Sequence, residues 1–139
     1  YENLKRAKNE LASGGFTLVL YDGCELICSQ KRGIAPLVDL YKSGRNFSAF
    51  SAADKVVGRA AAFMYVLLGV KSLYAGCVSK PALEVLDAWG VAVEHKECAE
   101  RISSRDGAGL CPMESAVMDI RTPEDAFKAI LKKQRELLG

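Results

Sequence analysis

The stretch VKSLYAGCVSKPALEVLDAWGVAVE, residues 70–94, decides the fold class. Residues 70–78 are typical of a strand, residues 81–89 of a helix that Gly90 ends, and residues 91–94 of a second strand. A strand–helix–strand unit of this kind implies parallel pairing through a right-handed crossover. The stretch therefore predicts an α/β protein with a sheet that is at least partly parallel.

An antiparallel pair precedes this unit. Residues 16–21 and 24–29 are predicted strands, and Asp22-Gly23 between them is a strong signal for a tight hairpin. The sheet is therefore expected to be mixed. Further helices are predicted over residues 4–11, 33–41, 52–68, 98–104, 111–119 and 122–138, and Thr122 is expected to cap the last of them. Without a repeat or an internal linker, residues 1–139 are interpreted as a single domain.

The predicted helix over residues 52–68 should be central. Its second half, residues 60–68, is apolar on nearly every face, and Gly69 stands where a left-handed cap belongs. A helix that is apolar all round is expected to be buried.

Charged residues gather at the start of this helix and form the first candidate site. Asp54 is a possible base, and Lys55 and Arg59, four residues apart, would share a helix face. Gly58 within a helix costs about 1 kcal/mol relative to alanine, which suggests that a ligand or another backbone approaches closely. In the alternative interpretation, Ser51 and Asp54 only form a capping box that satisfies free amides.

The second candidate site is the segment RDGAGLCPME, residues 105–114. Gly107 and Gly109 would let backbone amides point at one anion, and Arg105 and Asp106 would add side-chain contacts to a ligand. The segment lacks the spacing of a Walker loop or of a dinucleotide fingerprint. A simple tight turn is the alternative.

Cys111 stands at the expected start of the helix over residues 111–119. The helix dipole at that position would favour its thiolate, with Asp106 or Glu114 as a partner. Cys111 and Glu114 are therefore candidate catalytic residues. A buried thiol beside a capping acid is the structural alternative.

Composition excludes several classes of protein. The net charge of +2 gives no reason to expect nucleic-acid binding, and no segment has the roughly 20 apolar residues of a membrane span. The first residues show no apolar signal-peptide core. Five scattered cysteines, an odd number, indicate reduced thiols and a cytoplasmic protein.

Two other features favour ordinary structural roles. Cys24 and Cys28 lie in a predicted strand, too far apart for a metal clip or a disulfide. His95, the only histidine, is expected at a solvated strand end.

The segments ADKVVGRAAA (residues 53–62) and RDGAGLCPME (residues 105–114) resemble those of domain-of-unknown-function family 1893. The resemblance covers nearly the whole chain and includes the Asp22-Gly23 hairpin and the segment SKPALE (residues 79–84). It implies a three-layer α/β/α, cytidine-deaminase-like fold with a mixed sheet, whose site lies at the starts of two helices.

A zinc deaminase of this fold has a His or Cys with a Glu two residues on at the first helix start, and Pro-Cys-x-x-Cys at the second. At the first position this chain has Asp54-Lys55-Val56, and at the second it has Pro81-Ala82-Leu83-Glu84. Neither supplies the three protein ligands of a catalytic zinc site. We therefore expect no metal and no cofactor.

Three functions follow as hypotheses. The leading one is binding of a nucleotide or an ADP-ribose-type small molecule in the former deaminase cleft, with Lys55, Arg59 and Arg105 on phosphates. The second is an enzyme that uses Cys111 as nucleophile. The third is a non-enzymatic homo-oligomeric interaction domain, in which Trp89 and the apolar edge of the last helix would form contacts.

Overall fold

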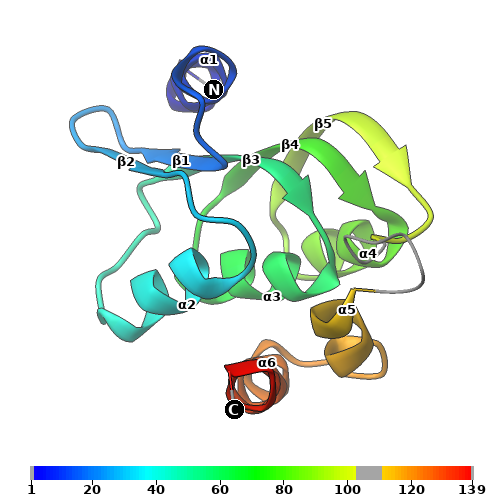
Figure 1. The fold of residues 1–139 in the computed structure, drawn as a ribbon. Helices are drawn as coiled ribbons and strands as arrows, with labels where there is room; N and C mark the ends of the chain where they lie inside the picture. The colour runs from blue at the N-terminus through cyan, green and yellow to red at the C-terminus, as the bar shows by residue number, and fades with distance from the viewer. Residues whose placement is uncertain (1, 103–110, 139) are drawn as a thin grey trace.

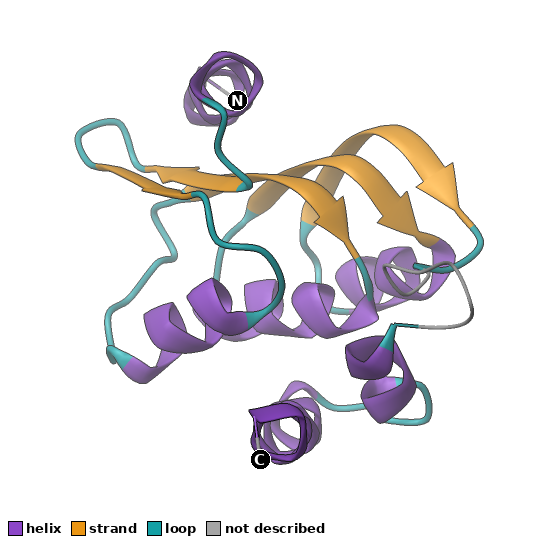
Figure 2. Ribbon diagram, in the orientation of Figure 1, coloured by secondary structure: helices purple, strands orange, loops and turns teal. Residues whose placement is uncertain are grey.

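A five-stranded mixed sheet forms the centre of the computed structural model, which describes residues 2–102 and 111–138. The strand order is β2-β1-β3-β4-β5, with β1 antiparallel to both neighbours and β3, β4 and β5 parallel (Figure 2). The strands are β1 (Leu18–Tyr21), β2 (Leu26–Ser29), β3 (Ser51–Val57), β4 (Ser72–Ser79) and β5 (Ala92–Ala99). The predicted α/β class and mixed sheet are confirmed.

Helices cover both faces of the sheet (Figure 1). They are α1 (Glu2–Gly14), α2 (Ala35–Lys42), α3 (Arg59–Leu68), α4 (Lys80–Ala88), α5 (Pro112–Val117) and α6 (Pro123–Leu138). Helix α1 lies on one face, and α2, α3 and α4 lie side by side on the other. Helices α5 and α6 pack outside α3, as a further layer beyond the expected three.

The position of α3 explains its apolar sequence. Phe63, Met64 and Tyr65 are all 0% exposed, because α3 lies between the sheet and α6. Gly69 ends the helix with a φ of 84°, the left-handed cap that the sequence predicts. The central, buried helix is therefore confirmed, but its beginning is not.

The predicted helix over residues 52–68 is wrong in its first third. Residues 51–57 form β3, the middle strand of the sheet, and α3 begins only at Arg59. Ala52 and Ala53 are both 0% exposed, so the strand is covered on both faces and lacks the apolar–polar alternation that would reveal it. Alanine is also the strongest helix former, which favours the wrong assignment.

This correction removes the predicted capping box. The Oγ of Ser51 lies 2.8 Å from the Oγ of Ser72 on the adjacent strand, and Asp54 is in mid-strand. Lys55 and Arg59 do not share a helix face, because Lys55 belongs to β3. Gly58 is the N-cap of α3 and not a helix-interior residue.

The other boundaries differ less. The hairpin after Tyr21 is confirmed, although its loop has four residues, because Tyr21 pairs with Leu26. The short helix expected over residues 98–104 is wrong for residues 98–102, which the structure describes, since β5 continues to Ala99 and no helix follows there. His95 lies within β5 and is exposed. The cap at Thr122 is confirmed: its Oγ1 accepts a hydrogen bond from the amide of Asp125 at 3.3 Å.

Candidate ligand-binding pocket

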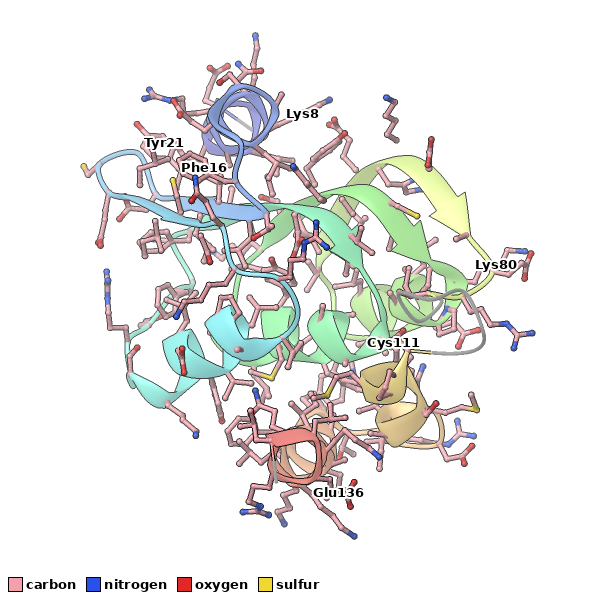
Figure 3. The ribbon with its side chains drawn as sticks, in the orientation of Figure 1. Lys8, Phe16, Tyr21, Lys80, Cys111 and Glu136 are labelled. Atoms are coloured by element: carbon pink, nitrogen blue, oxygen red, sulfur yellow. The ribbon has the colours of Figure 1, made fainter. Side chains whose placement is uncertain are left out.

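A cavity of about 430 Å³ lies on the face of the sheet that α2 and α3 cover, where β3 ends. Its walls come from the start of β1, the segment before α2, the end of β3 and the starts of α3 and α5. Figure 3 labels Cys111 where the chain enters α5. The lining residues are mainly apolar and include Leu18, Ile34, Leu37, Ala60, Ala61, Ile102 and Met113.

Asp54 supplies a buried carboxyl group to this pocket. Its residue is 8% exposed, because Leu18, its partner on β1, and Ala75, its partner on β4, flank it within the sheet. The phenol of Tyr65 donates a hydrogen bond to Oδ2 at 2.7 Å, and the amide of Val56 donates to Oδ1 at 3.3 Å. Asp54 is therefore held in place by one hydrogen bond on each oxygen.

Burial raises the pKa of Asp54 from its ordinary value of 3.8 to about 6, although the hydrogen bond from Tyr65 and the nearby backbone amides of Val56 and Lys55 oppose the shift. Burial and the neighbouring carboxylate also raise the pKa of Tyr65 well above its ordinary value. The phenol thus keeps its proton and acts only as a donor to Asp54. A carboxyl group with a pKa near neutrality is suited to ligand binding or proton transfer.

Three cationic residues lie around the cavity. Lys31, Arg32 and Lys55 all line it and all are exposed. Within residues 2–102 and 111–138, none of the three forms an ion pair. Their charges are therefore available to an anionic group that enters the pocket.

Glu114 is the second buried carboxylate of the pocket, at 7% exposure. It caps α3: Oε1 accepts from the amide of Arg59 at 2.6 Å, and Oε2 accepts from the amide of Ala60 at 2.9 Å. A Cβ at Gly58 would lie 2.5 Å from the Glu114 carboxyl carbon. Glycine at position 58 therefore admits the cap, and the free amides at this helix end already have an anionic partner.

Arg59 faces away from this pocket. Its guanidinium donates to the carbonyl oxygens of Val117 at 3.1 Å, Pro81 at 3.3 Å and Ile120 at 2.6 Å. The Arg59 side chain also stacks on Phe63, with 5.1 Å from Cζ to the ring centroid. These contacts hold α3 against α4, against the end of α5 and against the segment that follows it. They also engage the guanidinium that was expected, from the sequence, to bind a phosphate.

Cys111 lines the pocket as the N-cap of α5 and is partly buried. It makes no side-chain capping bond. The expected partner Glu114 is engaged with α3, and Asp106 lies outside the described residues. Arg105, Gly107 and Gly109 also lie outside them, so the predicted anion-binding loop stays a prediction.

Among the described residues, the helix starts at this pocket belong to α2, capped at Ile34, α3, capped at Gly58, and the short α5. Of the two starts expected from the sequence, only that of the central helix, α3, is among them, and it lies a few residues after Asp54 and Lys55. The segment at residues 81–84 begins α4 and borders other cavities. In the part of the chain that the structure describes, no three His, Cys, Asp or Glu residues form a group that could hold a metal ion.

Sequence reasoning named Asp54, Lys55, Gly58, Cys111 and Glu114, and the structure brings all five to the pocket. It missed Tyr65, Lys31 and Arg32. Lys31 and Arg32 could have been noticed, because two adjacent cations precede Gly33 and a predicted helix. Nothing in the local sequence marks Tyr65.

Exposed apolar side chains lie elsewhere on the surface. Trp89 after α4 is 48% exposed, and Leu137 and Leu138 at the end of α6 are 60% and 89% exposed. Self-association through them stays a prediction. None of the described helices is long and apolar enough to span a membrane.

Comparison with known proteins places the chain in a family. Residues 6–133 match the family described as a domain of unknown function, DUF1893. The chain therefore belongs to the DUF1893 family, as its resemblance indicated. A search of curated proteins finds no match.

The fold is also similar to a solved structure. The crystal structure of a DUF1893 family protein from Thermotoga maritima, at 2.70 Å resolution, matches with a TM-score of 0.87 and 28% sequence identity. The match covers 96% of this chain and 91% of that chain. The family description assigns no activity, so function has to be inferred from the pocket.

Proposed function

We propose that this protein binds a nucleotide-type small molecule in the pocket around Asp54. The observation that carries the proposal is the combination of a buried carboxyl group, apolar walls and three cationic residues, none ion-paired among the described residues, around one cavity of about 430 Å³. Small-molecule pockets typically measure about 300–1,000 Å³ and pair apolar walls with a few placed polar groups.

The chemistry of the walls matches the parts of such a ligand. Leu37, Ala61 and Met113 offer an apolar surface to a flat heterocycle. Asp54 can accept hydrogen bonds from ring or ribose groups. Lys31 and Arg32 can bind phosphate, and they replace Arg59, whose guanidinium is engaged elsewhere.

A cytidine-deaminase-like fold is part of the same proposal. Its support is the mixed sheet order β2-β1-β3-β4-β5 and a pocket at helix starts that include those of α2 and α3. These starts carry Ile34-Ala35-Pro36 and Gly58-Arg59-Ala60. Neither contains an imidazole or thiol, and although Cys111 lines the pocket, the described residues include no group of three His, Cys, Asp or Glu side chains that could hold a metal ion, so zinc is not part of the proposed binding.

Thermal shift followed by calorimetry tests the proposal. The panel contains the four common nucleoside monophosphates, ADP-ribose, the parent nucleosides and inorganic phosphate. We expect at least one phosphorylated compound to raise the Tm and to bind more tightly than its nucleoside, because the cations contact phosphate. No rise with any nucleotide at millimolar concentration would contradict the proposal.

Variants locate the binding. Replacing Lys31 and Arg32 together by glutamine should weaken nucleotide binding by about tenfold or more and leave nucleoside binding unchanged. The matched control replaces Lys132 and Arg135, which lie on α6 away from the pocket, by glutamine. Equal losses in both double variants would show that net charge, and not this pocket, governs binding.

A further inference from the structure

We propose that Asp54 recognises two adjacent N–H donors on the head group of the ligand, as on the guanine edge or on an amidinium or guanidinium group. This inference rests on the proposed function and deepens it, because it selects among ligands by the hydrogen-bonding pattern of one edge. Asp54 would contact the ring end of the ligand, whereas Lys31 and Arg32 would contact its anionic end.

The carboxylate of Asp54 has acceptor positions that its neighbours do not use. An ionised carboxylate has two oxygens with about four acceptor positions and no donor. Tyr65 and Val56 each use one position, on different oxygens, while the nearby amide of Lys55 donates to the carbonyl oxygen of Thr17 at 3.1 Å. Each oxygen therefore keeps an acceptor position for a ligand, and two parallel N–H groups fit such a pair of oxygens.

Asp54 has no cationic partner in the part of the chain that the structure describes. Asp54 is 8% exposed, and among the described residues no cationic side chain forms an ion pair with it. Its two partners are a phenol and a backbone amide, both neutral. A buried carboxylate that lacks a cation is stabilised most by a ligand that brings two polarised N–H groups or a positive charge.

The protonation state of Asp54 limits which ligand edges it can bind. With a pKa of about 6, Asp54 is mainly ionised at neutral pH and accepts hydrogen bonds without donating any. Adenine and cytosine edges each present one donor beside one acceptor, and that acceptor would face a carboxylate oxygen. Guanine presents N1–H beside the N2 amine, so both of its groups donate. The ionised carboxyl group therefore discriminates in favour of guanine.

The decisive comparison uses guanosine monophosphate and inosine monophosphate, which differ only in the N2 amine. Calorimetry on the unaltered chain at pH 7.5 should show inosine monophosphate binding at least about tenfold more weakly, because one hydrogen bond to a buried carboxylate is lost. Adenosine monophosphate should bind more weakly still. Benzamidine, which carries an amidinium without a nucleotide, is the second arm.

A variant tests the role of Asp54 directly. Asp54→Asn presents one acceptor and one donor, so it should lose the preference for guanosine over inosine monophosphate and should favour xanthosine monophosphate, whose C2 carbonyl accepts a hydrogen bond. Circular dichroism checks that the variant folds. The comparison on the unaltered chain does not depend on the variant.

The outcomes separate this inference from the proposed function. Equal affinities for guanosine and inosine monophosphate would overturn the inference while nucleotide binding stands. Binding of benzamidine that requires Asp54, with no nucleotide bound, would support the N–H pair and overturn the nucleotide. Absence of binding in both arms would overturn both.

Discussion

Asp54 and Glu114 are two buried carboxyl groups of one pocket with different surroundings. They are 8% and 7% exposed, and both line the cavity. Glu114 accepts two backbone amides at the start of α3, at 2.6 and 2.9 Å. Asp54 accepts a phenol and one longer amide contact at 3.3 Å.

The difference separates a structural role from a chemical one. Glu114 satisfies amides that a helix start leaves free, and its negative charge complements the helix dipole. Asp54 has no helix end to neutralise it, and burial raises its pKa to about 6. Burial alone therefore does not mark a functional carboxylate, whereas the donors around it do.

The largest expected effect is the pH dependence of stability that Asp54 causes. Its pKa is about 6 in the folded protein, against an ordinary 3.8, so the folded state holds a proton that the unfolded state has released. This contribution is fully present below about pH 4 and is lost as the pH rises through 6. The difference between a pKa of 3.8 and one of about 6 corresponds to roughly 3 kcal/mol in the free energy of unfolding.

The matched control is Asp54→Asn, which cannot titrate. Denaturant unfolding at several pH values should show the free energy of unfolding of the unaltered chain falling by that amount relative to the variant between about pH 4 and pH 7. Subtracting the pH profile of the variant removes the contributions of the other titrating groups. Among these are Asp22, Glu25 and Glu136, whose lowered pKa values change the stability in the opposite direction. Parallel pH profiles would show that Asp54 is not desolvated as described.

A smaller effect is expected from removing the cap of α3. Glu114→Ala leaves the amides of Arg59 and Ala60 without their acceptor and should lower the free energy of unfolding by about 2 kcal/mol. Gly58→Ala should lower it by a similar amount, because the new Cβ displaces the carboxylate. Thermal or urea unfolding measures both changes.

The double variant is the control for this explanation. Once Glu114 is alanine, the methyl group at position 58 meets no carboxylate, and its cost should fall below about 1 kcal/mol. The φ of Gly58 is −94°, which alanine adopts without strain. Additive losses in the double variant would show that Gly58 is required for another reason.

Much of the fold could be predicted because local signals and packing agreed. The parallel unit at residues 70–94, the hairpin after Tyr21 and the cap at Thr122 all depend on local patterns that the structure retains. Strand β3 could not be predicted, because burial on both faces erases its alternation and its alanines favour a helix.

In the candidate site, too, local signals could be predicted and long-range contacts could not. Gly58 and Glu114 were correctly singled out as unusual, but their partnership spans 55 residues from Arg59 to Glu114 and has no sequence period. Tyr65 could not be connected with Asp54 while both were assigned to one helix. The contact across eleven residues exists because the chain turns between β3 and α3.

The most direct test of the contrast between the two carboxylates is a carbon-13 NMR titration of the Asp54 carboxyl group, in the free protein and with guanosine monophosphate. We expect a midpoint near pH 6 in the free protein. Saturation with the nucleotide should move the midpoint to lower pH, because two N–H donors stabilise the ionised form. A midpoint near 4 in the free protein, or one that a saturating nucleotide leaves unchanged, would contradict the role assigned to Asp54.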